Sequence, residues 1–239
     1  MYPGKAAGWN PRGNFGGPLC YGPAVESDPS RLARQRYAAA PCLPREGPVD
    51  VRSLIAGPFA RLELEVGPGR GGFLLERVTA RPEVGLIGFE IKRKWAVLVN
   101  DRLARQGLAD RGRVLADDVR LAFPRLGPDG VLSALFFHFP DPWWKKRHQK
   151  RLVLGTDVLD EGARLLAPGG ELFVQTDVAE RADLYEAQIL AHPAFVARGD
   201  TTPSARMAEN PYDARSHRER RAIEDRIPIH RLRFARKDG

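Results

Sequence analysis

Apolar and polar positions along the chain follow a pattern typical of strands that alternate with helices. Residues 61–66 alternate in polarity as a strand does, then run into a glycine-rich turn and a helix through Val78. The same succession continues along the chain. The other predicted strands are 85–90, 114–117, 131–139 and 171–176, and the other predicted helices are 93–106, a long helix ending at Leu166, and 179–191.

This order of elements predicts an α/β fold with a doubly wound, mostly parallel sheet and helices on both faces. Residues 131–139 are nearly all apolar, as expected for a strand that is buried on both faces. Sheets of this kind bind ligands beyond the carboxyl ends of their strands. We therefore expect the functional residues to lie at those strand ends.

The first part of the chain has a different character. Residues 1–48 are rich in Gly and Pro and show no sustained period, so they are predicted to form a flexible extension to a single domain over residues 49–239. Cys20 and Cys42 make no disulfide framework, and the five histidines lack paired metal-ligand spacing. No run approaches the roughly 20 apolar residues of a membrane span. A cytoplasmic protein without a metal site is expected.

Basic residues are concentrated in two stretches of a chain whose net charge is +8. Five Lys or Arg lie between Asp141 and Arg151, and nine lie between Arg215 and Lys237 against three acidic residues. Clustered positive charge attracts polyanions such as nucleic acids, whereas evenly scattered charge indicates only solubility. A solvated protein face is the alternative interpretation.

The turn after the first strand predicts a nucleotide-containing ligand. Gly67, Gly69 and Gly72 match the spacing G-x-G-x-x-G, which lets the backbone approach a ligand closely. This spacing by itself does not distinguish between cofactors. Glu90 follows at the end of the second strand, where an acceptor for ribose hydroxyl groups is expected.

Further carboxylates at the strand ends favour one cofactor. Glu65 lies just before the first glycine, and Asp117 ends the third strand, with Asp118 as a near-equal alternative for an adenine contact. A pyrophosphate gains nothing from nearby carboxylates, whereas a sulfonium cofactor with an α-ammonium group does. The acids therefore predict S-adenosylmethionine. The alternative is that Glu65 is a salt-bridged strand residue and Asp117 a turn former.

The segment 139–148, Phe-Pro-Asp-Pro-Trp-Trp-Lys-Lys-Arg-His, is the most specific in the chain. Its two prolines fix the backbone on either side of Asp141, which presents a carboxylate at the end of the fourth strand. Trp143 or Trp144 could stack on a base or pack in the core, and the cations that follow could hold phosphates. A carboxylate here could accept from the Watson–Crick edge of guanine.

Four segments of the chain resemble, in order and spacing, the bacterial tRNA (guanine-N7-)-methyltransferases. They are Glu65–Gly69, Gly88–Glu90, Phe139–His148 and Thr176–Asp177. The resemblance extends roughly from residue 62 to residue 219. It implies a Rossmann-like class I methyltransferase fold of seven strands with the last antiparallel, S-adenosylmethionine as cofactor, and N7 of guanine 46 in the variable loop of tRNA as acceptor.

The resemblance also implies roles for individual residues. By position, Glu65, Glu90 and Asp117 would bind the cofactor beside Gly67 and Gly69, and Asp141 would adjoin both cofactor and guanine. The positions implied to contact RNA are Lys145, Asp177, Ser216 and Glu219. The C-terminal segment departs from the family, since Ser216 replaces a threonine and Arg218 the usual aromatic residue. Asp177 could instead cap the helix that follows it.

Guanine N7 carries a lone pair and no proton, so methyl transfer to it needs alignment and a suitable electric field rather than a base. Asp141 is predicted to be the main catalytic residue, and tRNA the partner of a monomer or homodimer that does not bind membranes. Other interpretations stay open at this point. They are a class I methyltransferase acting on another RNA or on a small molecule, a non-catalytic RNA-binding module, and a hydride-transferring Rossmann enzyme.

Overall fold

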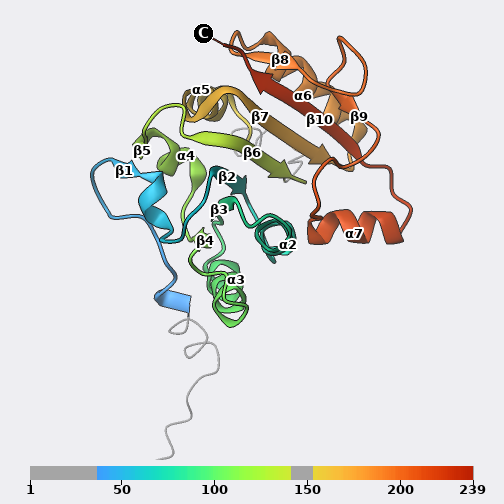
Figure 1. Ribbon diagram of the computed structural model, residues 1–239. Coiled ribbons are helices and arrows are strands. Elements are labelled where there is room, and N and C mark those ends of the chain that lie inside the picture. Colours follow the sequence, from blue (N-terminus) through green and yellow to red (C-terminus); the bar gives the residue numbers. More distant parts are fainter. Residues whose placement is uncertain (1–36, 141–152, 239) are drawn as a thin grey trace, which may run out of the picture. The chain divides into compact units, whose positions relative to one another are not determined.

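A computed structural model describes residues 37–140 and 153–238 (Figure 1), and the structural statements below refer to these residues. They belong to one unit that runs from Tyr37 to Gly239. Within it, the predicted alternation of strands and helices is confirmed, with boundaries that differ from the predicted ones by one or two residues in most elements and by five at the start of the strand predicted at 171–176, which begins at Leu166.

The main sheet has eight strands, seven of which follow the order β4-β3-β2-β6-β7-β10-β8, while β9 pairs with β10. Strands β2, β3, β4, β6 and β7 are parallel, and β10 runs antiparallel to β7, β8 and β9. The strand order reverses between β2 and β6, where parallel sheets bind their ligands. The strands are β2 (Arg61–Val66), β3 (Val84–Phe89), β4 (Gly112–Leu115), β6 (Leu132–His138), β7 (Leu166–Thr176), β8 (Phe195–Ala197), β9 (Arg206–Met207) and β10 (His230–Arg236).

Helices and short elements surround this sheet. No helix in the described part of the chain is both long and apolar enough to cross a membrane. The helices are α2 (Gly72–Ala80), α3 (Arg93–Arg105), α4 (Val119–Ala122), α5 (Thr156–Leu165), α6 (Ala179–Ala191) and α7 (His217–Glu224), with 3₁₀-helices η1 (Val51–Leu54) and η2 (Phe123–Arg125), and a separate strand pair β1 (Val49–Asp50) and β5 (Leu126–Gly127).

Neighbouring residues of the central strands face opposite sides of the sheet, and both sides are covered. On β6, Phe136 packs in a cluster with residues of α2 and α3, while Phe137 packs in a second cluster with residues of α4, α5 and α6. Both rings are buried. Covering on both faces explains why residues 131–139 are almost entirely apolar, and it confirms the doubly wound class I arrangement.

A buried ion pair links the central strand to the first helix. Arg77 of α2 donates to both carboxylate oxygens of Glu63 on β2, at 2.9 and 2.7 Å, and both side chains are buried. The ring of Tyr212 lies 5.2 Å from the Arg77 guanidinium, and its hydroxyl donates to Glu171 at 2.9 Å. Burial raises the pKa of Tyr212 well above its usual value, so the phenol remains a donor at neutral pH.

Residues 37–48, which the sequence assigns to the N-terminal extension, lie against the end of β4. The carbonyl of Pro41 accepts from the backbone N–H of Ala116 at 2.6 Å, and the side chains of Ala40 and Leu43 are buried. Arg125 donates to the carbonyl of Pro44 at 2.6 Å. This stretch is therefore attached to the sheet, while the division into an extension and a single domain stays a prediction.

Replacing Arg77 with Met should strongly destabilise the fold, because it leaves the buried Glu63 carboxylate without its hydrogen-bonded partner, and the half-exposed guanidinium of Arg61 lies 3.9 Å away. We expect the free energy of unfolding to fall by about 3–5 kcal/mol, measured by urea denaturation followed by circular dichroism. The double variant Glu63→Gln/Arg77→Met should recover part of this loss. Arg52→Ala, which breaks an exposed pair with Asp50, is the control and should change little. Equal losses in the Arg77 and Arg52 variants would contradict the assigned role.

Candidate functional site

The glycine-rich turn after β2 leaves open space at its tip. Gly67 and Gly69 have φ angles of +70° and +53°, in the left-handed region that favours glycine. A Cβ atom on either would meet no other atom within 4 Å, whereas a Cβ on Gly71 would lie 2.6 Å from the Val99 side chain. The first two glycines therefore leave room for a ligand, and Gly71 allows α3 to pack closely.

Two cavities adjoin this turn at the carboxyl ends of the strands, with volumes of about 410 and 560 Å³. The residues that the sequence predicted to bind the cofactor come from different strands, and those in the described part of the chain line these two cavities. Both cavities are lined by Gly67, Gly69, His138, Phe139 and Pro140. The first is also lined by Glu90, Ile91, Trp95, Asp117 and Asp118, and the second by Glu65, Thr176, Asp177, Ser216 and Arg218.

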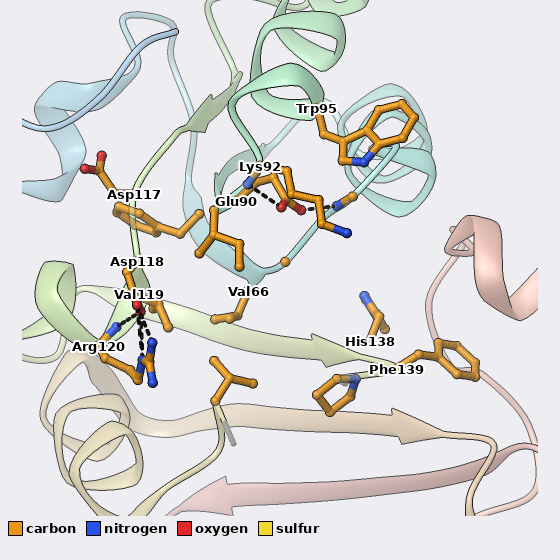
Figure 2. A pocket seen from close by; sticks show the side chains of 16 residues that line it. Val66, Glu90, Lys92, Trp95, Asp117, Asp118, Val119, Arg120, His138 and Phe139 are labelled. Atoms are coloured by element: carbon orange, nitrogen blue, oxygen red, sulfur yellow. Dashed lines mark hydrogen bonds and ion pairs between the residues drawn. The ribbon is translucent and has the colours of Figure 1, made fainter. Parts of the chain in front are cut away.

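Glu90 joins the glycine turn to the end of β3. One of its carboxylate oxygens accepts from the backbone N–H of Gly69 at 2.9 Å, and the other accepts from the backbone N–H of Lys92 at 2.8 Å (Figure 2). The side chain is largely buried at the wall of the first cavity. A carboxylate has further lone pairs, so Glu90 can still accept from ligand hydroxyl groups.

The two acids considered for an adenine contact have different partners. Asp117 accepts from the backbone N–H of Leu43 at 2.8 Å, and its carboxylate points away from Glu90 in Figure 2. Asp118 caps α4 by accepting from the backbone N–H of Arg120 at 3.0 Å, and it also pairs with the Arg120 guanidinium. The side-chain hydrogen bond from Arg120 lowers the pKa of Asp118. Asp118 is therefore engaged within its own helix, and Asp117 with the N-terminal segment.

Glu65 and His138 form a pair that the sequence did not reveal. The Oε1 atom of Glu65 lies 2.9 Å from Nδ1 of His138, and both side chains are buried. Among the described residues, neither Oε2 of Glu65 nor Nε2 of His138 has a hydrogen-bond partner. The signal in the sequence was a polar residue, His138, at the end of a strand that is otherwise apolar except for Ser133.

Phe139 has an unusual backbone conformation beside the cavities. Its φ angle of +51° is uncommon for a bulky residue, and its backbone N–H donates to the carbonyl of Gln175 at 2.8 Å. Such strained positions are found at functional sites, where the surrounding structure holds them. Asp141 and Lys145 follow shortly after Phe139, but they lie outside the described residues, as do both tryptophans of the motif. Their roles stay predictions.

Asp177 pairs with Arg218, which also lines the second cavity, and it does not cap α6. The Nε atom of Arg218 donates to the carboxylate of Asp177 at 3.0 Å. The N-cap position of α6 is occupied by Val178, and no side chain makes a capping hydrogen bond there. The interpretation of Asp177 as the capping residue is therefore wrong. Arg218 thus joins α7 to the end of β7.

The other two predicted RNA contacts have distinct environments. Ser216 lines the second cavity and caps α7 by accepting from the backbone N–H of Glu219 at 3.1 Å. Glu219 is fully buried and accepts from Asn210 at 2.9 Å and from Arg231 at 3.2 Å. Its carboxylate therefore anchors α7 to β10, and the residue lines neither of the two cavities.

The C-terminal arginines are partly compensated by acids that are distant in sequence. Glu76 of α2 pairs with Arg220, and Asp177 pairs with Arg218. Arg221 pairs within its own segment with Asp225, at 2.9 Å. The positive charge of this region is therefore smaller than the basic residues alone indicate.

The donor and acceptor groups around the two cavities suit a nucleoside with a cationic end. The open positions at Gly67 and Gly69 allow a ligand to approach the backbone closely. Glu90 at the wall of the first cavity can accept from hydroxyl groups, and Glu65 at the wall of the second has a buried acceptor atom without a partner in the described structure. S-adenosylmethionine has both kinds of group, so these residues fit it.

Comparisons with known proteins identify close relatives. A family profile described as "Putative methyltransferase" matches residues 60–232. The tRNA (guanine-N(7)-)-methyltransferase of Rhodospirillum rubrum is 40% identical over 173 residues, which cover 70% of this chain and 67% of the relative. The protein of the same name from Anaeromyxobacter dehalogenans is 39% identical over 188 residues, which cover 78% of this chain and 91% of the relative.

Solved structures with low sequence identity share the fold. The 16S rRNA methyltransferase KamB matches with a TM-score of 0.56 and 16% identity, covering 78% of this chain and 91% of that protein. The antibiotic-resistance methyltransferase Kmr matches with a TM-score of 0.52 and 20% identity, covering 83% of this chain and 98% of that protein. At this level of identity, these similarities show the fold alone.

Two variants of Asp118 should distinguish the stability that comes from capping α4 from the stability that comes from its negative charge. Asp118→Ala should lower the free energy of unfolding by about 1 kcal/mol, while Asp118→Asn, which can still cap α4, should cost less. Since Arg120 lowers the pKa of Asp118 below its usual value of 3.8, the charge stabilises the fold above that pH and ceases to do so as the pH falls through the folded-state pKa. Urea unfolding at several pH values should show the difference between the wild type and Asp118→Asn vanishing in acid. A constant difference would contradict this assignment.

Proposed function

The chain belongs to the family of tRNA (guanine-N(7)-)-methyltransferases, and we propose on this basis that it methylates N7 of guanine 46 in the variable loop of tRNA. Transfer of a methyl group from S-adenosylmethionine to N7 of a tRNA guanine is the activity of the family. Nucleotide 46 is the more specific part of the proposal, and the resemblance of segment 139–148 supports it. The observation that carries the proposal is the set of carboxylates and open glycines around two adjoining cavities at the point where the strand order reverses.

S-adenosylmethionine, when bound, supplies a methyl group on a positively charged sulfur. We assign its ribose hydroxyl groups to Glu90. From its sequence position and the resemblance we assign its adenine side to Asp117, which lines the first cavity while one of its carboxylate oxygens accepts from Leu43 (Figure 2). Gly67 and Gly69 allow the close approach of the ligand to the turn. Glu65, in the wall of the second cavity, would hold the cationic end of the cofactor.

The residues of the chain act by alignment and electrostatics, because guanine N7 has an available lone pair and no proton to remove. We assign to Asp141 the orientation of the guanine and the stabilisation of positive charge on the purine ring. Lys145 is assigned to a phosphate of the RNA. Both assignments come from the resemblance of their sequence segment to the family.

The second cavity and α7 complete the proposed RNA contact. Asp177 and Ser216 line this cavity, and Arg218, whose side chain is about half exposed, can exchange its partner Asp177 for an RNA group. Glu219 supports this contact indirectly, because its buried bonds to Asn210 and Arg231 hold α7 in place. A cytoplasmic location and a monomeric or homodimeric state stay predictions.

Incubation of unmodified tRNA with radiolabelled S-adenosylmethionine tests the proposed activity. We expect one methyl group per tRNA, and borohydride and aniline treatment should cleave the chain at nucleotide 46, since N7-methylguanine is the labile base. A transcript with adenine at position 46 is the matched control and should remain unlabelled. Label that persists in this control would contradict the proposed position, and no label in any tRNA would contradict the function.

Replacing Asp141 with Asn should remove a fixed negative charge while preserving the size of the side chain. We expect turnover to fall by about 10²- to 10³-fold, the usual effect of losing one preorganised electrostatic group. The dissociation constant of S-adenosylmethionine should change by less than about tenfold. Asp157→Asn, at an exposed position on α5, is the control. Near-normal turnover in the Asp141 variant would contradict its catalytic assignment.

A further inference from the structure

A row of buried polar side chains crosses four neighbouring strands of the sheet. Its members are Glu65 of β2, His138 of β6, Gln175 of β7 and Arg231 of β10. His138 lies opposite Gln175 in the register of β6 and β7, and Gln175 lies opposite Arg231 in that of β7 and β10. Opposite residues on adjacent strands point to the same side of the sheet, with Cβ atoms about 5 Å apart. The Gln175 side chain therefore lies between those of His138 and Arg231.

The two ends of this row are hydrogen-bonded, whereas its middle is not. Nδ1 of His138 lies 2.9 Å from Oε1 of Glu65. The Arg231 guanidinium donates to Glu219 of α7 at 3.2 Å. Among the described residues, Nε2 of His138, both amide atoms of Gln175 and Nε of Arg231 have no hydrogen-bond partner. Native structures usually give such buried atoms a partner from protein or ordered water, because burying them without one is unfavourable.

The atoms without partners are complementary in pairs. An ionised carboxylate only accepts, so Nδ1–H of His138 donates to Glu65, and Nε2 of the neutral ring is then an acceptor. The amide nitrogen of Gln175 is a donor and matches His138. The amide oxygen is an acceptor and matches the Nε–H of Arg231. One buried water on each side of the amide, which accepts from one neighbour and donates to the next, can complete the row.

The direction of these hydrogen bonds is the same along the whole row. Each group donates toward Glu65, from the positively charged guanidinium of Arg231 at one end to the carboxylate at the other. Hydrogen bonds aligned in this way polarise one another and are stronger in buried surroundings. The backbone does not require a glutamine at this position, since the carbonyl of Gln175 accepts from Phe139 at 2.8 Å whatever the side chain. The amide side chain therefore calls for an explanation of its own.

We propose that Gln175 is a positioning residue, which joins His138 to Arg231 through one buried water on each side of its amide. The row then connects Glu65, in the wall of the second cavity, with the pair of Arg231 and Glu219 that holds α7. Gln175 itself lines neither of the two cavities and contacts no ligand in this scheme. Its effect on cofactor and tRNA rests on the proposed function, whereas the hydrogen-bonded row does not.

Nitrogen-15 NMR of the full-length protein with labelled histidine tests the His138 end of the row. The spectrum of His138→Asn identifies the signals of this ring by their loss. In the wild type, the ring should carry its proton on Nδ1 and accept a hydrogen bond at Nε2. Gln175→Met has a side chain of similar length without the amide, so the Nε2 signal should shift toward that of a lone pair without a hydrogen bond. Gln188→Met, whose amide donates to Leu154 outside the row, is the matched control and should leave the signal unchanged.

The direction of the change in stability is a second test. If the amide is bonded on both sides, Gln175→Met deprives buried atoms of His138 and Arg231 of their partners, and the urea midpoint should fall. If the amide is unbonded, removal of its two buried polar atoms should leave the midpoint unchanged or raise it. Gln188→Met is again the control.

Steady-state kinetics separate positioning from a general loss of folded protein. In Gln175→Met, the KM values for S-adenosylmethionine and for tRNA should each rise by about tenfold, because the residues at both ends of the row are held less firmly. The kcat value should stay within about threefold of the wild type, since the row touches no reacting atom. A smaller folded fraction would instead lower kcat and leave both KM values unchanged.

The outcomes distinguish the row from the function. A proton on Nε2 of His138 in the wild type would overturn the proposal. So would an unchanged Nε2 signal, an unchanged or higher urea midpoint, or a fall in kcat at constant KM in Gln175→Met. If the wild type methylates tRNA, these results leave the proposed function intact. If the NMR and urea results agree with the row and no tRNA is methylated, only the function fails.

Discussion

The arrangement of the site depends on how the central strand compensates two buried negative charges. Glu63 and Glu65 are alternate residues of β2, and both are almost completely shielded from solvent. A carboxylate in such a place is strongly unfavourable unless a partner accompanies it. Arg77 from α2 and His138 from β6 are those partners. Their contacts hold the helix and the neighbouring strand against β2, so the glycine turn that follows β2 lies beside His138.

The same principle governs the C-terminal segment, where charge is balanced across elements that are far apart in sequence. Arg218 pairs with Asp177, so α7 reaches the second cavity through an ion pair. Glu219, on the buried face of this helix, anchors it to β10 by pairing with Arg231, and both side chains are buried. Ion pairs thus position α7, the helix to which we assign RNA binding. The same ion pairs reduce the positive charge that this segment can offer to RNA phosphates.

Much of the fold could be predicted from local pattern, and the exceptions have physical causes. The parallel strands are recognisable because burial on both faces requires continuous apolar residues, as in residues 131–139. The resemblance implied a last antiparallel strand, but the residue pattern did not place it at 230–236, where Leu232 and Phe234 share one face and Arg231 and Arg233 the other. Residues 37–48 were expected to be flexible because they belong to a segment that is rich in Gly and Pro and shows no sustained period. Their attachment depends on hydrogen bonds such as that from the backbone N–H of Leu43 to the Asp117 carboxylate, which joins residues 74 positions apart.

The sequence by itself determined the order of the elements, the glycine turn, the acids at the strand ends and the family motif after β6, because each of these depends on neighbouring residues. Only the tertiary structure decided what each polar side chain contacts. It paired Glu65 with His138, buried Glu219 on the inner face of α7 beside Arg231, and gave Asp117 and Asp118 different partners. The reason is that hydrogen bonding and burial depend on distances in space, and the partners come from strands and helices that are widely separated along the chain.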